Sequence, residues 1–148
     1  MKSRSKSGFT LVEILIVVVI LGILAAIVIP QFSQASSDAR NSSVKSNLQM
    51  LRSQVELYKI QHADAEPDAN SLTDFTGCMT EKSDVDGTVN ASGAYGPYMQ
   101  RIPVNAVNDK SGMSFDNLNG SVPSADNTVG WIYDKDSGRI YAGNNTSW

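Results

Sequence analysis

The sequence predicts an α+β fold in which one long N-terminal helix packs against a small antiparallel β-sheet. Residues 31–61 contain neither proline nor glycine, and their apolar residues recur with helical spacing. The C-terminal third instead alternates apolar and polar residues in short segments separated by glycine-containing turns. Sixteen uncharged residues, 14–29, precede the amphipathic part, so we expect the first half of the helix to span a membrane.

Charge is distributed unevenly along the 148 residues. Three of the 12 basic residues lie in the first eight positions, and the remainder of the chain has nine basic against 15 acidic residues, a net charge of −6. Sequence-wide nucleic-acid binding requires clustered Lys and Arg, so this composition argues against it. It suits a domain exposed to solvent outside the cytoplasm.

Catalysis finds little support in the side chains. Cys78 is the single cysteine and His62 the single histidine, and they are distant in sequence without a local catalytic signature. We expect Cys78 to be a small buried residue and His62 to pack or face solvent at the helix end. No intrachain disulfide is possible with one cysteine.

The apolar segment admits three interpretations. Residues 9–29 are interrupted only by Thr10 and Glu13, and about 20 apolar residues span a bilayer core. The preceding basic residues predict that positions 1–8 stay cytoplasmic. A cleaved secretory signal with a cleavage site at residues 33–35, or a plain signal anchor, would also begin this way. Neither explains the carboxylate of Glu13 inside an apolar segment, which is a candidate functional group.

Residues 6–13, Lys-Ser-Gly-Phe-Thr-Leu-Val-Glu, resemble the class III signal of type IV prepilins and type II secretion pseudopilins. The resemblance implies that prepilin peptidase cleaves between Gly8 and Phe9 and N-methylates Phe9, leaving the anchor attached. It also implies that Glu13 sets the register between subunits. Gly22 and Pro30 match the helix-weakening positions of that family.

The spacing gives Glu13 a physical partner. Cleavage would create an amine at Phe9, four residues away, which is about 6 Å along a helix axis. A subunit shifted by that distance could place its amine against this carboxylate, since charges in low dielectric are tolerated when paired. Pro30 removes a backbone hydrogen bond, so we expect a kink near residues 26–30. The predicted organisation is leader 1–8, transmembrane and assembly helix 9–30, amphipathic helix 31–61 and globular domain 62–148.

The amphipathic helix has a stripe at spacings of 4, 3, 4 and 3, and Leu57 and Ile60 are expected to widen it. A short helix is predicted around residues 71–80, with Ser71 as its cap. Residues 113–118 alternate as a strand, and residues 129–134 and 139–142 form a hairpin with Gly138 at a bulge position. The stripe that should face the core is Val44, Leu48, Leu51, Val55 and Tyr58.

No cofactor is required by the sequence, and calcium is the one ligand worth weighing. Asp84 with Asp86, and Asp134 with Asp136, place two carboxylates two positions apart beside a glycine. Neither pair has the later glutamate of an EF-hand loop, and turns alone favour Asp and Gly. The resemblance implies calcium in C-terminal loops, because major pseudopilins bind it there, although these ligands do not match clearly.

The function predicted from the sequence is that of a structural, non-enzymatic filament subunit, most consistent with a type II secretion pseudopilus that exports folded proteins. The lone Cys78 favours it over type IV pilins whose C-terminal loop is closed by a disulfide. A type IV pilus subunit for adhesion, motility or DNA uptake and a signal-anchored periplasmic binding module are the alternatives. Expected partners are prepilin peptidase, identical or related subunits in a homo-oligomeric filament, and an inner-membrane assembly platform, with the C-terminal domain in the periplasm or outside a bacterial inner membrane.

Overall fold

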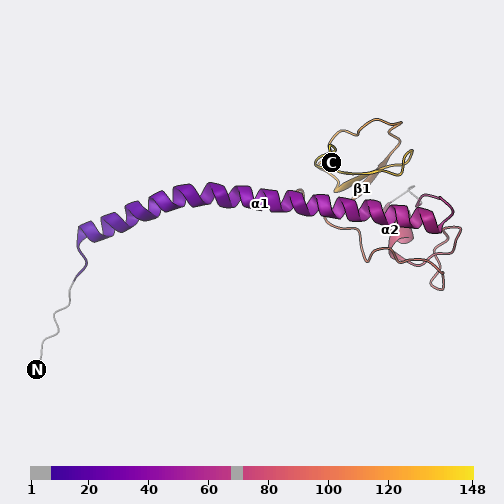
Figure 1. Cartoon of the computed structure of the whole chain (residues 1–148), viewed down its shortest axis with the longest axis horizontal. Helices are drawn as coiled ribbons and strands as arrows, with labels where there is room; N and C mark the ends of the chain where they lie inside the picture. Colours follow the sequence, from indigo (N-terminus) through magenta and orange to yellow (C-terminus); the bar gives the residue numbers. More distant parts are fainter. Residues whose placement is uncertain (1–7, 68–71) are drawn as a thin grey trace, which may run out of the picture. The chain divides into compact units, whose positions relative to one another are not determined.

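The computed structural model describes residues 8–67 and 72–148. Contacts divide the chain into two units, Met1–Asp38 and Ala39–Trp148, and the boundary lies inside the first helix (Figure 1). The elements found in the described residues are α1 (Leu11–Gln61), α2 (Leu72–Thr80), β1 (Met113–Asp116), β2 (Trp131–Asp134) and β3 (Ile140–Ala142).

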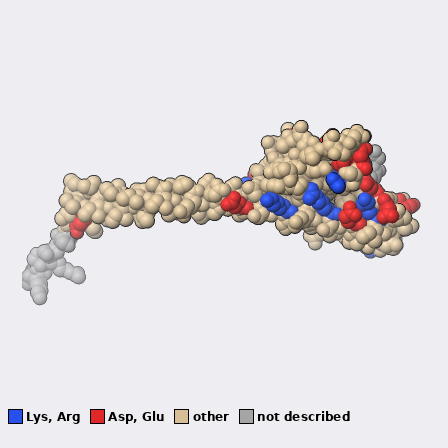
Figure 2. Space-filling view, turned by 45° about the horizontal axis from the view of Figure 1, so that its top comes forward, with Lys and Arg blue, Asp and Glu red and all other residues tan. Residues whose placement is uncertain are grey.

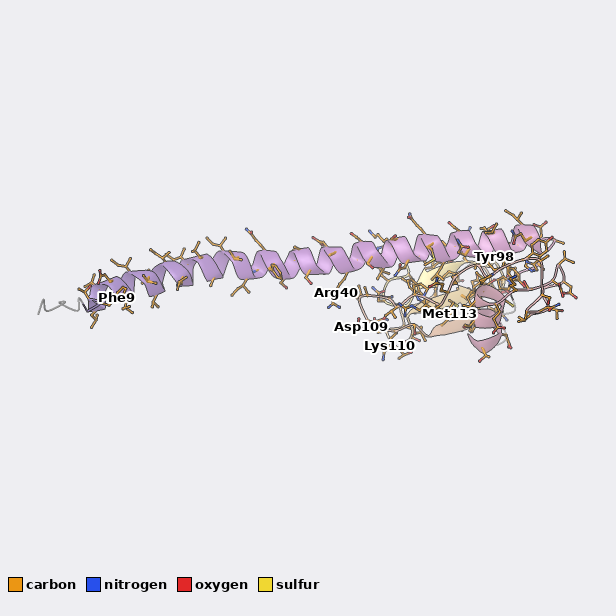
Figure 3. The ribbon with its side chains drawn as sticks, turned by 90° about the horizontal axis from the view of Figure 1, so that it is seen from below. Phe9, Arg40, Tyr98, Asp109, Lys110 and Met113 are labelled. Carbon is orange, nitrogen blue, oxygen red and sulfur yellow. The ribbon has the colours of Figure 1, made fainter. Side chains whose placement is uncertain are left out.

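The first unit contributes an exposed apolar helix. Its large apolar side chains from Leu11 to Ile29 are all at least 51% exposed, and they leave the helix on every side (Figure 3). An 18-residue window reaches a mean hydropathy of 3.3, so by length and composition this helix could cross a membrane. The helical assignment continues through Gly22 and Pro30. The kink expected near residues 26–30 stays a prediction.

The second unit is built on the C-terminal half of α1. All five residues of the predicted stripe are at most 2% exposed, which confirms the helical periodicity. They share a core with Phe75 and Met79 of α2 and with the strands. Cys78 is buried in the same core, as predicted. The strand residues in this core are Met113, Trp131, Tyr133, Ile140 and Ala142.

Leu57 and Ile60 do not widen this stripe, and that prediction is wrong. They are 40% and 74% exposed. Each follows a stripe residue by two positions, Val55 and Tyr58, and two positions turn a helical side chain by about 200°. Both side chains therefore point away from the core.

The sheet is mixed, with strand order β1-β2-β3. The predicted hairpin is confirmed: β2 and β3 pair antiparallel, and Gly138 has the positive φ of 66° that its turn requires. The β1–β2 pair differs from the antiparallel prediction, because Met113 pairs with Trp131 in a parallel ladder. Residues 117–130 are long enough to carry the chain back to the start of β2, as a parallel pair demands.

The helix predicted around residues 71–80 is confirmed as α2, which turns Phe75, Cys78 and Met79 toward the core. Ser71, its expected cap, lies outside the described residues. Residues 101–104 form an irregular segment. Ile102 packs against the core, and the backbone oxygen of Pro103 accepts a 2.8 Å hydrogen bond from Trp131 Nε1.

Candidate processing and assembly site

The predicted cleavage position lies immediately before α1. Gly8 and Phe9 are exposed, and Figure 3 labels Phe9 beside the N-terminal end of α1, two residues before the helix begins at Leu11. A Cβ built on Gly8 would meet no atom within 4 Å. The bond between these residues is therefore open to an enzyme in the isolated chain.

Glu13 takes part in a capping box at the start of α1. Its Oε2 accepts hydrogen bonds from the Thr10 amide at 2.7 Å and the Thr10 hydroxyl at 2.8 Å. The Glu13 amide in turn donates to Thr10 Oγ1 at 3.2 Å. Such Thr-x-x-Glu boxes satisfy amide groups that the first helical turn leaves without partners. The sequence contained this signal, which gives Glu13 a local role beside the predicted one.

The capping box leaves part of the carboxylate available. Both bonds from Thr10 go to Oε2, and among the described residues Oε1 has no hydrogen-bond partner. A carboxylate accepts several hydrogen bonds at once. Glu13 can thus keep its contact with Thr10 while Oε1 accepts a bond from a second donor.

Asp134 and Asp136 organise the β2–β3 turn. Asp134 is buried, and its Oδ1 accepts bonds from the amides of Leu118 and Asp136, both at 3.1 Å, while Ser137 donates to its Oδ2. Burial raises the pKa of Asp134, but these hydrogen bonds outweigh it and hold the pKa below its usual range. Asp136 Oδ2 accepts from the Asn119 amide at 2.8 Å. These carboxylates fasten the turn to residues 118–119.

Asp84 and Asp86 lie in a separate turn. Asp84 Oδ2 accepts from Asn90 Nδ2 at 2.8 Å, and Asp86 Oδ1 accepts from the Thr88 amide at 3.0 Å. The bond from Thr88 lowers the pKa of Asp86. Within the described ranges, no three His, Cys, Asp or Glu side chains gather closely enough to hold a metal ion. The structure does not bring the two predicted calcium pairs together.

His62 packs inside the second unit. Its ring stacks on Tyr58 at a centroid distance of 3.8 Å. Nδ1 lies 2.8 Å from the backbone carbonyl oxygen of Tyr58, and Nε2 lies 2.9 Å from Ser83 Oγ. Nδ1 thus bonds within the last turn of α1, and Nε2 joins the end of α1 to the segment that follows α2, which is the packing role expected for this residue.

The N-terminal segment matches a known family model. Residues 3–29 match the prokaryotic N-terminal methylation motif, which includes Gly8, Phe9, Glu13 and Gly22. This match defines the class of N-terminal segment that the chain carries.

The chain is also similar in sequence to curated proteins of two kinds, a type II secretion core protein and type IV pilins. The chain is 42% identical over 62 residues to type II secretion system core protein G of Pseudomonas aeruginosa, which covers 42% of this chain and 44% of that protein. It is 52% identical over 44 residues to the type IV major pilin protein PilA of Myxococcus xanthus, covering 30% and 20%. It is 48% identical over 56 residues to the type IV major fimbrial protein FimA of Dichelobacter nodosus, covering 38% and 35%.

These matches span less than half the length of each relative. No solved structure is significantly similar to the chain. The resemblance seen in the sequence is confirmed: the chain carries the methylation motif and is similar to pseudopilins and to type IV pilins. The pilin-like α+β fold, with a long apolar N-terminal helix and a small sheet, is also confirmed.

Proposed function

We propose that this chain is a structural, non-enzymatic subunit of a type II secretion pseudopilus, a helical filament that supports protein export. The exposed apolar half of α1 carries this proposal. So large a continuous apolar surface is stable only in lipid or against other apolar helices. A subunit stored in the bacterial inner membrane and then transferred to a filament uses both environments in turn.

Processing precedes assembly in this scheme. The basic leader of residues 1–8 stays in the cytoplasm, and the globular domain crosses to the periplasm. Prepilin peptidase cleaves between Gly8 and Phe9 and methylates the new amine of Phe9. The methylation motif and the similarity to core protein G support this order of events. An inner-membrane assembly platform then adds the subunit to its neighbours.

Glu13 registers one subunit against the next. Its Oε1 receives the amine of a neighbouring Phe9 while Oε2 stays with Thr10. The pair then exists only between subunits that are displaced by the correct axial distance. Catalysis has no part in this function, and neither does a bound cofactor.

Three variants separate register from helix capping. Glu13→Gln removes the negative charge but keeps a side-chain oxygen that accepts from Thr10. Thr10→Ala removes the Thr10 hydroxyl but keeps the charge of Glu13. Glu13→Val removes both the charge and the accepting oxygen. We expect Glu13→Gln and Glu13→Val to insert and be cleaved but to assemble poorly, whereas Thr10→Ala assembles. Sheared filaments are counted at matched subunit levels. Normal filament yield from Glu13→Gln would show that Glu13 acts only as a cap.

A type IV pilus subunit is the second candidate function. The identities to two type IV major pilins, 52% and 48%, favour it, because they exceed the 42% identity to core protein G. These two matches cover shorter segments, 44 and 56 residues against 62. Deleting the gene separates the two. Loss of secreted proteins from the medium identifies the pseudopilus, and loss of surface filaments with secretion intact identifies the pilus. A chain that remains monomeric in its native membrane would contradict both functions and favour a signal-anchored binding module.

A further inference from the structure

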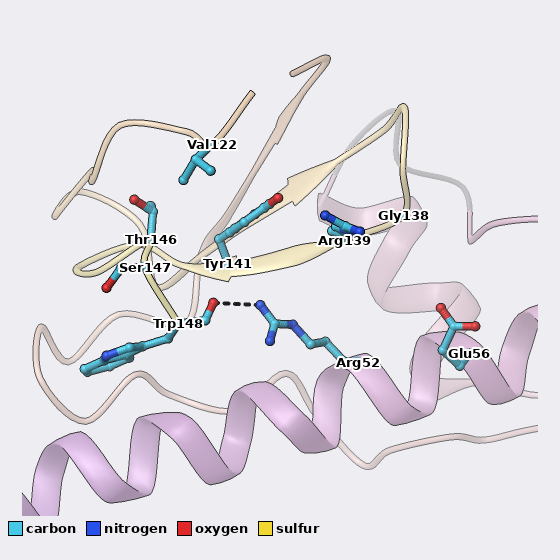
Figure 4. A pocket seen from close by; sticks show the side chains of 9 residues that line it. All are labelled: Arg52, Glu56, Val122, Gly138, Arg139, Tyr141, Thr146, Ser147 and Trp148. Carbon is cyan, nitrogen blue, oxygen red and sulfur yellow. Dashed lines mark hydrogen bonds between the residues drawn. The ribbon is translucent and has the colours of Figure 1, made fainter. Parts of the chain in front are cut away.

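The C-terminal half of α1 and the segment that follows Gly138 enclose a groove (Figure 4). Two adjoining cavities of about 660 and 190 Å³ share Arg52 and Trp148 as lining residues and together form this groove. The larger cavity lies within the range of about 300–1,000 Å³ typical of binding sites. The groove lies entirely within the second unit.

Apolar side chains line the groove together with three basic residues, Lys45, Arg52 and Arg139. Lys45 Nζ lies 5.0 Å from the centroid of the Trp148 ring, and Arg52 donates to the Ile140 oxygen at 2.7 and 3.0 Å. Arg139 is exposed and forms no ion pair with the described residues. Glu56 is the one acidic residue of the lining, and its carboxylate lies 4.0 Å from Lys59. The groove therefore suits an occupant that combines an apolar side chain with carboxylates.

Such a surface exists elsewhere on the same chain, in the acidic turn of residues 84–87. The Gly87 amide closes the turn by donating a 2.9 Å hydrogen bond to the backbone carbonyl oxygen of Asp84, and the φ of Gly87 is 84°. Val85 is 58% exposed at the turn, between Asp84 and Asp86. An apolar side chain flanked by two carboxylates matches the groove in both charge and polarity.

The acidic turn and the groove lie on different sides of the buried stripe. The turn lies beside Tyr58, whose hydroxyl would be 2.8 Å from a Cβ built on Gly87. At 100° per residue, Lys45 and Arg52 lie on the other flank of the stripe from Tyr58. Figure 2 shows one face of the second unit, on which basic and acidic side chains lie next to one another and acidic ones are more numerous at the end far from the apolar helix. Two complementary surfaces on different sides of one chain fit a contact between copies.

We propose that the acidic turn of one subunit docks into the groove of the next. Val85 packs on the apolar side chains of the groove, and the carboxylates face Lys45 and Arg139. This contact rests on the proposed filament function and names the surfaces that join two subunits. The contact is head-to-tail, so the first and last subunits of a row each keep one unoccupied surface, an acidic turn or a groove. Repeating the contact builds a helical filament when the rotation between successive subunits does not close a ring.

The axial offset follows from helix geometry. Arg52 precedes Tyr58 and His62, which lie against the loop of the acidic turn, by six to ten residues. At 1.5 Å per residue the two copies are displaced by about 9–15 Å along α1. A filament offers each subunit neighbours at several offsets, so the contact at Glu13 involves another neighbour.

Cross-linking in assembled filaments of the full chain tests the contact. Val85→Cys and Ser147→Cys alter exposed side chains, while the native Cys78 stays buried. With a short bis-maleimide, we expect the double variant to give a ladder of dimers, trimers and longer products on denaturing gels. Mixed filaments of the two single variants should give dimers alone. A matched pair that combines Val107→Cys with Ser147→Cys should give no ladder.

Charge exchange supplies a second measurement. We expect Asp86→Lys and Arg139→Glu each to lower filament yield at least about fivefold, because like charges meet at the contact. The double variant should restore the yield, since the attraction is re-formed in the opposite sense. A purely structural loss in either variant would not be restored.

The outcomes distinguish the contact from the filament function. If the unmodified chain forms filaments, but the cysteine double variant gives no ladder and the charge-exchange double variant does not restore the yield, the contact is overturned and the filament function stands. If the unmodified chain forms no filaments beside its native assembly machinery, both proposals fall.

Discussion

Replacing Leu51 by alanine tests whether α1 is part of the core of the globular unit. Leu51 is completely buried among the strands and α2. Its truncation should cost about 2–5 kcal/mol in the free energy of unfolding, through lost burial and the cavity left behind. Leu57→Ala, six positions along the same helix, removes the same atoms from a side chain that is 40% exposed. That control should cost less than about 1 kcal/mol.

These costs convert into melting temperatures. The second unit has 110 residues, Ala39–Trp148. At about 2.1 cal/mol/K per residue its unfolding entropy is about 0.23 kcal/mol/K, so each kcal/mol lowers the melting temperature by about 4 °C. We expect a loss of about 9–22 °C for Leu51→Ala and less than about 5 °C for Leu57→Ala.

Circular dichroism melts of a fragment that begins at Gln31 measure the difference. Equal shifts for Leu51→Ala and Leu57→Ala would show that the helix face buried in the structure is not the face that stabilises the domain. An unchanged melting temperature for both would show that the sheet and α2 fold without α1.

Further predictions concern processing, solubility and pH. N-terminal sequencing of the mature protein should begin at a methylated Phe9, and Gly8→Leu should leave the precursor in the membrane; a terminus at Ser36 would instead identify a cleaved secretory signal. The fragment from Gln31 should elute as a soluble monomer in size-exclusion chromatography, because it lacks the apolar helix and has a net charge of −5, with nine basic and 14 acidic residues; filaments of this fragment would contradict the role of the anchor. The lowered pKa of Asp134 stabilises the folded domain above about pH 4, and this contribution is lost as the pH falls further, so Asp134→Asn should reduce the difference in melting temperature between pH 7 and pH 3. Because no three His, Cys, Asp or Glu side chains gather around Asp134 among the described residues, calcium and a chelator should leave the melting temperature unchanged, and a rise with calcium that Asp134→Asn abolishes would disprove this.

Local patterns predicted the parts of the fold that depend on neighbouring residues. The spacing of Val44, Leu48 and Leu51 is enough to identify the buried face, because helical geometry fixes which side chains share a side. The β2–β3 hairpin was equally accessible, since its turn and the positive φ of Gly138 involve only a few consecutive residues.

Features that depend on distant residues were not accessible in the same way. The parallel pairing of Met113 with Trp131 depends on the path of residues 117–130, for which alternation within each strand carries no information. Buried Asn105 is a similar case, because it donates to the Gly130 oxygen at 3.0 Å and to Asn144 Oδ1 at 2.6 Å. An asparagine in a loop gives no local sign of such distant partners.

The candidate site was predicted in part. The register role of Glu13 and the cleavage position stay predictions, whereas the capping box is observed and has a sequence signal in the spacing of Thr10 and Glu13. The capping box and the apolar run share these residues, so one stretch of sequence carries both a helix start and a membrane segment. The groove beside Arg52 and Trp148 had no signal, since its two sides are separated by 96 positions.

The contact of Arg52 with the Ile140 oxygen has a consequence for the order of synthesis. The two residues are 88 positions apart. At about 5–20 residues per second, a ribosome needs roughly 4–18 s to add the strand that covers this part of α1. The anchor has left the ribosome by then, while Leu48 and Leu51 still lack their partner strands. During these seconds the future core of the second unit is uncovered in the nascent chain, and this is when a chaperone or a protease would reach it.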